Sequence, residues 1–325
     1  MGLALIADGW HVVGWDPDPD VLGRALHNSV VTATAATRDQ AVAAGPDLLV
    51  LAGPPAAVIA DVAELSTEAL AMDLAGVKAP VVAANRLPRF VGTHPMAGRE
   101  SRGPDAASAA LFRGAAWVVA TDGASPADIA AVETIISATG ARPIQMEARH
   151  HDAAVAAVSH LPQVLASALV ASASGDASAL ELAAGSFRDL TRVAASDPPT
   201  WTQLLLANDT AVVDAIRSFQ SFLDSVAARI MAGDATAVTR FLADAQATRR
   251  TLAPPVVQIR VVLADQPGEL AKVGRAFEHT GVDVRDLQMR HAPHGGAGVL
   301  TVSVRPGEAE ALKAALVVEG LDLAE

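Results

Sequence analysis

The 325-residue sequence contains no cysteine and no tyrosine, and aromatic residues make up only 3% of it. Without cysteine, disulfide bonds, thiolate zinc sites and thiol nucleophiles are excluded. Charged residues are also scarce, at 18%, and the formal net charge is -12, without any run of lysine and arginine. This balance argues against a phosphate-rich partner such as nucleic acid or an anionic membrane, whose charge the protein would repel.

Long apolar runs are absent too, because no segment approaches the ~20 uninterrupted apolar residues of a membrane-spanning helix. The first eight residues lack a basic beginning and are interrupted by Asp8, so they do not resemble a signal peptide. Gly2 could accept a myristoyl group, but Ile6 stands where that motif needs Ser or Thr. We therefore expect a cytoplasmic protein.

Half of the sequence (51%) is hydrophobic, enough to bury a core, and the length suggests two or three domains. Residues 1–148 alternate strands that read as continuous apolar runs with helices. The expected strands are 10–16, 47–53, 70–73, 81–84, 90–92, 115–120 and 142–146, and the expected helices include 20–28, 56–64 and 126–139. This pattern predicts an α/β Rossmann-like domain with a doubly wound parallel sheet.

Strand signals stop in residues 149–252, which predict an all-helical domain. The expected helices are 152–174, 186–194, 198–232 and 235–248; Ser186 with Asp189 resembles a capping box, Asp234 is a candidate N-cap, and Pro162 should kink its helix. Because this helical block is so apolar, we expect it to bury one face against a second subunit, as a homodimer.

Residues 256–325 change to a strand–helix–strand–strand–helix–strand pattern, which predicts a small α+β domain.

Asp16 ends the first apolar strand, where an acid in a dinucleotide-binding unit accepts hydrogen bonds from the adenosine ribose. No Arg follows, and Asp18 and Asp20 would repel a 2′-phosphate, so NAD is favoured over NADP. The alternative is an ordinary turn acid. The glycine-rich loop expected upstream is absent, and Met1-Gly2 looks like its tail. The first strand of the sheet is thus missing, and either the true start lies upstream or the pyrophosphate site is lost.

The segment GTHPMAGRE places His94 just beyond a strand, at the edge of an α/β sheet where ligands bind. Alone, such a histidine could be structural. A second histidine-rich segment contains His150, His151 and Asp152. Neighbouring histidines point in different directions and no third ligand follows at the right spacing, so no metal site is predicted.

Several segments in order resemble the prephenate dehydrogenase family, including its arogenate-using relatives. They are HVVGWD ending at Asp16, DLAGVKAPV from Asp73, GTHPMAGRE from Gly92, HHDAAVAAVSHLP from His150, and FRDLTRVAASDPPTW from Phe187 to Trp201. The resemblance implies an NAD-dependent oxidative decarboxylation of prephenate to 4-hydroxyphenylpyruvate in tyrosine biosynthesis. His94 would be the catalytic residue that polarises the ring hydroxyl, as a neutral imidazole can.

The remaining site residues follow from the resemblance. Arg192 would bind the substrate side-chain carboxylate, which suits a bidentate guanidinium. His151, His160, Gln163, Trp201 and Arg99 would line the substrate site; Glu100, Arg188 and Asp189 would form a supporting ion network; and Gly2, Asp16, Pro54 and Asp73 would contact NAD. The alternatives are a solvated charged face for the arginines, and core packing for Trp201 and His160.

The C-terminal part, with DQPGEL from Asp265, resembles an ACT regulatory domain. The resemblance implies an effector site with Asp265, Gly268, Leu270 and Asp283, for tyrosine or phenylalanine, although Asp283 stands where Asn is common. A purely structural, dimer-forming domain is the alternative.

The sequence departs from the family pattern in three places. Ala75-Gly76 replaces a serine-bearing pair, Gln163 stands where a second histidine is common, and Ser101 is separated from Gly103 by Arg102. Two alternatives to prephenate dehydrogenase therefore stay open: an arogenate dehydrogenase, and a non-catalytic, amino-acid-responsive protein that has lost its phosphate loop.

Overall fold

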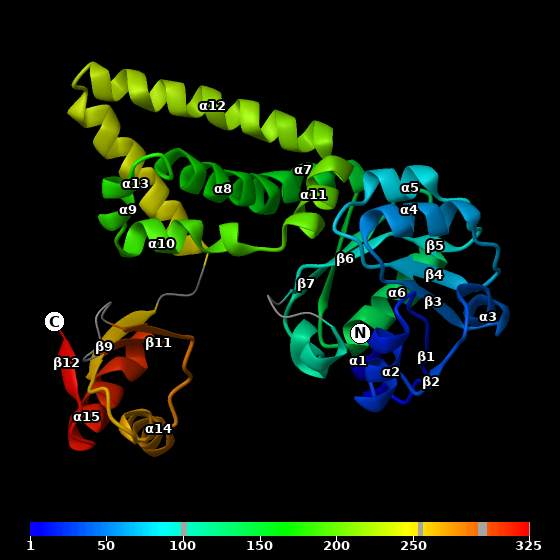
Figure 1. Cartoon of the computed structure of the whole chain (residues 1–325), viewed down its shortest axis with the longest axis horizontal. Helices are drawn as coiled ribbons and strands as arrows, with labels where there is room; N and C mark the ends of the chain where they lie inside the picture. Colours follow the sequence, from blue (N-terminus) through cyan, green and yellow to red (C-terminus); the bar gives the residue numbers. More distant parts are fainter. Residues whose placement is uncertain (99–102, 253–255, 292–297, 325) are drawn as a thin grey trace. The chain divides into compact units, whose positions relative to one another are not determined.

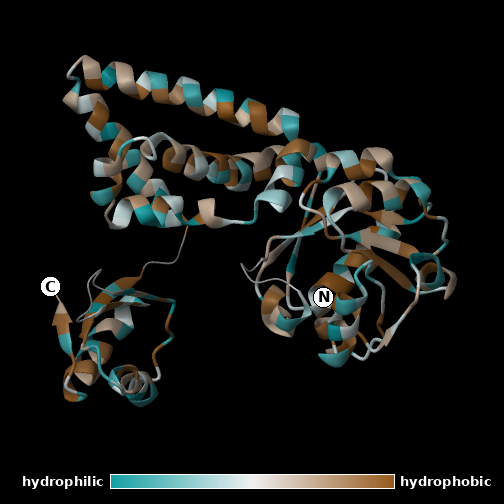
Figure 2. Cartoon of the chain, in the orientation of Figure 1, coloured by the Kyte–Doolittle hydropathy of each residue, from teal (hydrophilic) through white to brown (hydrophobic). Residues whose placement is uncertain are grey.

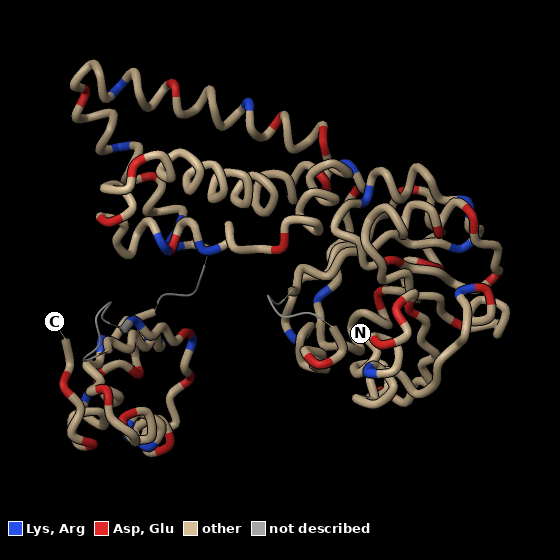
Figure 3. The backbone as a smooth tube through the Cα atoms, in the orientation of Figure 1, with Lys and Arg blue, Asp and Glu red and all other residues tan. Residues whose placement is uncertain are grey.

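The structure, a computed structural model, describes residues 1–98, 103–252, 256–291 and 298–324 (Figure 1). It divides into two compact units, Met1–Phe222 and Leu223–Glu325, which are described separately. Acidic and basic residues are interspersed along both units (Figure 3).

The first unit begins as an α/β domain built on parallel strands. Strands β3 (Leu48–Leu51), β4 (Leu70–Asp73) and β5 (Phe90–Val91) pair in that order, with Leu48 opposite Leu70 and Ala71 opposite Phe90. Their carboxyl ends therefore meet at one edge. The predicted strands at 47–53, 70–73 and 90–92 are confirmed.

Helices cover both faces of this sheet (Figure 1). Met72 faces α6 (Pro126–Ala138) in one core, whereas Ala71 faces α4 (Pro55–Glu64) and α5 (Ala79–Ala84) in the other. Successive side chains of a strand point to opposite faces, so a strand buried on both sides must be apolar throughout. The predicted doubly wound architecture follows from this burial.

The prediction of a strand at 81–84 is wrong, because these residues belong to α5. Pro80 lies in the first turn of α5, where the missing N–H breaks no helical hydrogen bond. The Asp152 carboxylate accepts from the amides of Lys78 and Ala79 at the beginning of this helix. A short apolar run alone does not distinguish a buried helix from a strand.

Beyond Gly92 the chain enters a second set of strands. β6 (Thr93–Pro95) pairs with β7 (Ala116–Ala120), which pairs with β8 (Arg142–Met146). The β7–β8 pair is parallel, but β6 runs antiparallel to β7. The prediction of a sheet that is parallel throughout is therefore wrong for these strands.

The amino-terminal elements form a separate pair of strands. β1 (Val13–Gly14) pairs in parallel with β2 (Ala33–Thr34), and within the described residues no pairing joins β1 to β3. The expectation that a first strand is missing stays a prediction. The helices here are α1 (Gly2–Ala7), α2 (Pro19–His27) and α3 (Arg38–Ala43).

Helices follow from residue 148 onward. They are α7 (Ala148–Val155), a π-helical turn (Ala156–His160), α8 (Leu161–Ala173), α9 (Ala177–Glu181), α10 (Gly185–Thr191), a 3-10 turn (Arg192–Ala195), α11 (Pro198–Ala207) and α12 (Asp209–Met231). The π turn lies directly before Pro162 and accommodates the missing proline amide by widening the helix.

Two predictions about these helices are wrong. The helix expected over 198–232 is interrupted at Asn208, whose backbone leaves the helical conformation. Ser186 does not cap α10, since the N-cap is Ala184 and no side chain satisfies the amides there.

The second unit contains α13 (Ala235–Thr251), whose amide of Ala237 donates to the predicted cap Asp234 at 2.9 Å. It continues into an α+β domain with strand order β10 (Asp286–His291), β11 (Gly298–Val304), β9 (Val257–Leu263) and β12 (Asp322–Ala324), all antiparallel. α14 (Glu269–Thr280) and α15 (Ala309–Val318) contribute Val273 and Leu312 to its core. The predicted βαββαβ topology is confirmed.

Candidate active site

His94 lies in β6, on a backbone fixed by buried hydrogen bonds. The amide of the preceding Thr93 donates to Asp73 Oδ1 at 2.8 Å, and the Thr93 hydroxyl accepts from Trp117 Nε1 at 3.0 Å. Thr93, Asp73 and Trp117 are fully buried. The imidazole therefore leaves a rigid strand at the carboxyl edge of the sheet.

Asp73 and Lys78 form an ion pair beneath this strand, and both side chains are completely buried. Burial raises the pKa of Asp73 while Lys78 opposes the rise; burial likewise lowers the pKa of Lys78 against the attraction of Asp73. Asp73 Oδ2 also accepts from the Ala75 amide at 3.0 Å. Its oxygens are thus used inside the domain, and a contact between Asp73 and NAD stays a prediction.

His94 contacts a second histidine from the helical region. Its Nδ1 lies 2.9 Å from His151 Nε2, and His151 Nδ1 lies 2.7 Å from Asp152 Oδ1. Asp152 in turn accepts from the amides of Lys78 at 2.7 Å and Ala79 at 2.8 Å. The beginning of α5 thus joins the α/β and helical parts through one carboxylate.

The site keeps His94 uncharged. Burial, and then the neighbouring His151, Lys78 and His160, lower the pKa of His94 to about 3. At neutral pH its imidazole is therefore available to accept a proton.

Asn208 ties the next histidine into the same cluster. Its Nδ2 donates to the Asp152 carbonyl at 2.9 Å and lies 3.2 Å from Nδ1 of the buried His160. Trp201 meets the His160 ring edge-on, with ring centres 6.0 Å apart. The break between α11 and α12 is what places Asn208 here.

The free face of His94 is bordered by Gly76 and Leu204. A β-carbon on Gly76 would lie 3.7 Å from His94 Nε2 and 2.9 Å from a methyl group of Leu204. Without a side chain at this position, the helical region supplies an apolar wall next to the imidazole.

Gln163, one turn beyond His160 on α8, is 6% exposed. Within the described part of the chain its Oε1 is buried without a hydrogen-bond partner. A buried amide oxygen of this kind requires a donor, and a ligand could supply it.

The predicted cationic residues lie elsewhere on the helices. Arg188 on α10 and Arg192, at the beginning of the 3-10 turn that contacts α8, are exposed, as is Asp189. Arg99 and Glu100 lie outside the described residues. Substrate binding by Arg192 stays a prediction.

The residues predicted to hold a dinucleotide lie on three different elements of the α/β domain. Asp16 follows β1, its Oδ1 accepting from the Asp18 amide at 2.9 Å, and Pro54 follows β3. A β-carbon on Gly2 would stand 2.1 Å from the Val30 carbonyl oxygen, so only glycine fits. Such close packing is the role of the last glycine in a dinucleotide-binding loop, and these residues fit the cofactor.

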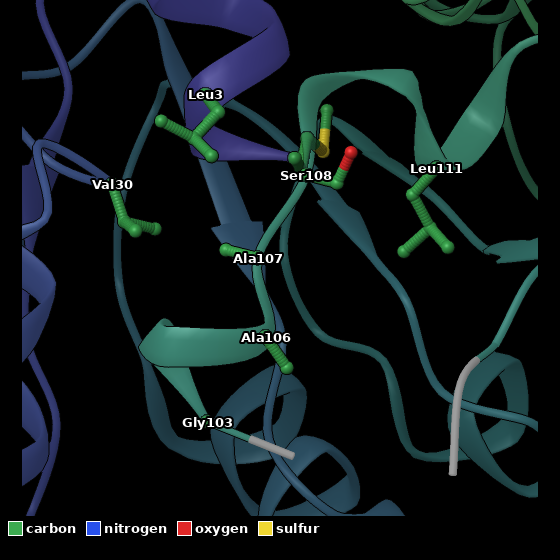
Figure 4. A pocket seen from close by; sticks show the side chains of 8 residues that line it. Leu3, Val30, Gly103, Ala106, Ala107, Ser108 and Leu111 are labelled. Atoms are coloured by element: carbon green, nitrogen blue, oxygen red, sulfur yellow. The ribbon is translucent and has the colours of Figure 1, made fainter. Parts of the chain in front are cut away.

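A pocket of about 210 Å³ lies beside the beginning of α1 (Figure 4). It is lined by Met1, Leu3, Val30, Gly103, Ala106, Ala107, Ser108 and Leu111. No lining side chain is charged and none belongs to the histidine cluster, so this pocket is not the place of the chemistry.

In the second unit, Gly268 has φ +97° and begins α14, so the predicted turn is formed, with Asp265 and Leu270 exposed. Asp283 Oδ2 lies 2.8 Å from Arg285 and 2.9 Å from Arg305. Its carboxylate is engaged by two arginines, which argues for a structural role.

An α/β domain of the nucleotide-binding type that places a half-buried, neutral imidazole against a helical region is typical of dehydrogenases with a separate helical domain. The family model "Prephenate dehydrogenase, nucleotide-binding domain" matches residues 1–145, and "Prephenate dehydrogenase, dimerization domain" matches residues 147–244. The chain belongs to the prephenate dehydrogenase family. This confirms the predicted family and its first two domains.

Individual relatives agree. The prephenate dehydrogenase of Lactococcus lactis subsp. cremoris is 31% identical over 195 residues, which cover 57% of this chain but 53% of that protein. The cyclohexadienyl dehydrogenase of Zymomonas mobilis is 33% identical over 198 residues, covering 58% and 68%. The match thus spans about half of the Lactococcus enzyme. In fold, the A. aeolicus prephenate dehydrogenase, solved with hydroxyphenyl propionate and NAD+, is similar with a TM-score of 0.72, at 24% identity and covering 77% of this chain and 92% of that one.

Sequence reasoning missed three residues of the cluster: Lys78, Asp152 and Asn208. Asp152 directly follows His151 in the quoted motif, and this His-Asp pair was the available signal. Lys78 lies in the quoted segment from Asp73, but nothing there marked it as the ion-pair partner of Asp73. Asn208 carried no signal, because its contacts are made across the fold.

Proposed function

We propose that the chain is an NAD-dependent prephenate dehydrogenase, which oxidises and decarboxylates prephenate to 4-hydroxyphenylpyruvate. The observation that carries this proposal is His94, held uncharged on a rigid strand within the family motif. The family membership and the dinucleotide-type packing of Gly2 support it.

In this mechanism His94 Nε2 accepts the proton of the substrate ring hydroxyl, an effect worth ~10²–10⁴ in rate. Leu204 borders the imidazole beside Gly76, and Trp201 packs against the neighbouring His160. Asp16, Pro54 and Gly2 would hold NAD, which supplies the hydride acceptor. Carbon dioxide then leaves as the ring becomes aromatic, and the substrate itself takes up the electrons.

The test measures reduction of NAD by the full chain with prephenate, beside NAD binding by fluorescence titration. We expect turnover in the wild type and its loss in His94→Asn, with NAD affinity retained. NAD binding without turnover of prephenate or arogenate would contradict the proposed substrate class. Failure to bind NAD at all would instead support the non-catalytic alternative.

Arogenate is the second candidate substrate, and Gln163 favours it. The unpartnered Oε1 of Gln163 can accept a hydrogen bond but cannot donate one. The ammonium group of arogenate could donate to this oxygen, whereas the keto oxygen of prephenate would have to accept from Nε2 of the same amide. If Gln163 contacts this group, Gln163→Leu should lower kcat/KM for arogenate more than for prephenate, and an equal effect on both would contradict this role.

We further propose that the protein is a cytoplasmic homodimer. α7 to α8, over Ala148–Ala173, is long and apolar enough to cross a membrane by length and composition alone, and 28% of its most apolar stretch is buried. Its buried face carries His151, Asp152 and Gln163, which a lipid environment would not favour. Apolar residues also alternate with polar ones along α12 (Figure 2). A second copy bound to the dimerization domain would cover these exposed apolar side chains.

The βαββαβ domain is proposed to be an ACT domain that binds tyrosine or phenylalanine. Support comes from the left-handed Gly268 and the exposed turn before α14. Isothermal titration of the full chain with each amino acid tests this, with Gly268→Val as the variant expected to abolish binding. Absence of binding to the wild type would favour a purely structural domain.

A further inference from the structure

The histidine cluster has a fixed direction of hydrogen bonding. An ionised carboxylate only accepts, so the 2.7 Å contact of Asp152 requires the proton of His151 on Nδ1. Neutral His151 then offers an unprotonated Nε2 to His94, 2.9 Å away. His94 must therefore donate from its own Nδ1, which leaves its Nε2 unprotonated on the side of Gly76.

The carboxylate that fixes this order is itself fixed. The amides of Lys78 and Ala79 donate to the two oxygens of Asp152, and this residue is only 3% exposed. Backbone amides only donate, so both oxygens of Asp152 accept, and the two amides fix the carboxylate beside His151 Nδ1.

We propose that His151 and Asp152 are positioning residues that make His94 a proton acceptor and then take over the charge it acquires. This rests on the proposed dehydrogenase function. The substrate O–H bond breaks as a bond to His94 Nε2 forms, and the His94 Nδ1–H bond breaks as a bond to His151 Nε2 forms. The electron pair of the substrate C–H bond leaves as hydride to the nicotinamide.

The physical reason is the difference between the two imidazoles. A charge on His94 would be desolvated and would face His151, Lys78 and His160, each of which disfavours it; this is why the pKa of His94 falls to about 3. A charge on His151 would lie beside the Asp152 carboxylate. Asp73, the other acid of the cluster, is already paired with Lys78. Transfer of the Nδ1 proton of His94 to Nε2 of His151 therefore places the positive charge beside the Asp152 carboxylate.

Two variants separate positioning from charge transfer. Asp152→Asn removes the counter-ion and lets an amide donate to His151, which can reverse both tautomers. His151→Gln can still accept from His94 but cannot take up a proton. We expect kcat to fall ~10²–10⁴-fold in both, with KM within a few fold of the wild type. The acid limb of the kcat–pH profile should move to lower pH in Asp152→Asn.

The proton inventory in mixtures of light and heavy water gives the decisive kinetic readout. We expect a curved plot for the wild type, from two protons in motion, and a linear one for His151→Gln. A linear wild-type plot, or an unchanged kcat in His151→Gln, would overturn the charge transfer.

Nitrogen-15 spectra of histidine-labelled full-length protein test the tautomers without any substrate. At neutral pH both His94 and His151 should carry their proton on Nδ1, and Asp152→Asn should change this. Should His94 be protonated on Nε2 in the wild type, the proposal is wrong even if the enzyme turns over. Should the tautomers be as expected without turnover of prephenate or arogenate, the proposed function fails and the positioning part stands.

Discussion

The buried Asp73–Lys78 pair offers the most exacting test of the architecture beneath His94. Lys78→Met keeps the volume of the side chain but leaves the Asp73 carboxylate without its counter-ion in a fully buried place. Removing one partner of a buried ion pair costs roughly 3–5 kcal/mol. The amides of Thr93 and Ala75 still donate to Asp73, which keeps the loss at the lower end of this range.

The loss of stability in Lys78→Met should depend on pH, because it comes from the unpaired charge of Asp73. Burial raises the pKa of Asp73 once Lys78 no longer opposes it, so the unfolded state releases its proton more easily than the folded state. Stability of the variant is then retained below the ordinary pKa of 3.8 and is lost as the pH rises through the higher folded value. The deficit relative to the wild type should grow from acidic to neutral pH.

Urea unfolding of both proteins between pH 4 and 8 measures this deficit. Asp73→Asn combined with Lys78→Met is the matched control, because the amide can still accept from Thr93 and no charge is buried. We expect the double variant to recover part of the stability at neutral pH. A Lys78→Met deficit below about 1 kcal/mol, or one that does not change with pH, would refute an electrostatic role for the pair.

Three further predictions concern single sites. Arg192→Gln should mainly raise KM, by ~2–4 kcal/mol in transition-state terms if this residue binds the substrate carboxylate; an unchanged KM in steady-state kinetics would place the carboxylate elsewhere. The pKa of His94 is about 3 in the folded protein rather than 6.5, so the unfolded chain binds its proton first and the free energy of unfolding falls as the pH drops from 6.5 toward 3. In urea unfolding, His94→Asn should lose less stability than the wild type over this pH window. Parallel stability curves for the two proteins would contradict this prediction. Gly2→Ala should lower stability by roughly 1–3 kcal/mol, because a backbone oxygen 2.1 Å away cannot give way, whereas Gly23→Ala, with nothing within 4 Å, should be neutral or stabilising by thermal unfolding; equal behaviour of the two would show that α1 is not held as described.

The sequence by itself determined the order of the domains and most of their elements. Continuous apolar runs predicted β3 and β4 because strands buried on both faces have no polar side. The motif around His94 indicated the family, since its residues lie together in the chain. The same local information failed at residues 81–84, where a four-residue apolar run fits helix and strand equally.

Only the tertiary structure decided which residues of the candidate site form hydrogen bonds with one another. Asp152 binds the amide of Lys78, a residue 74 positions earlier, and Asn208 reaches both Asp152 and His160 because a helix breaks at that residue. Which polar groups become partners depends on how α5, α7 and α11 dock. Burial then sets the pKa of His94, because an imidazole is desolvated by neighbours that its own segment does not contain.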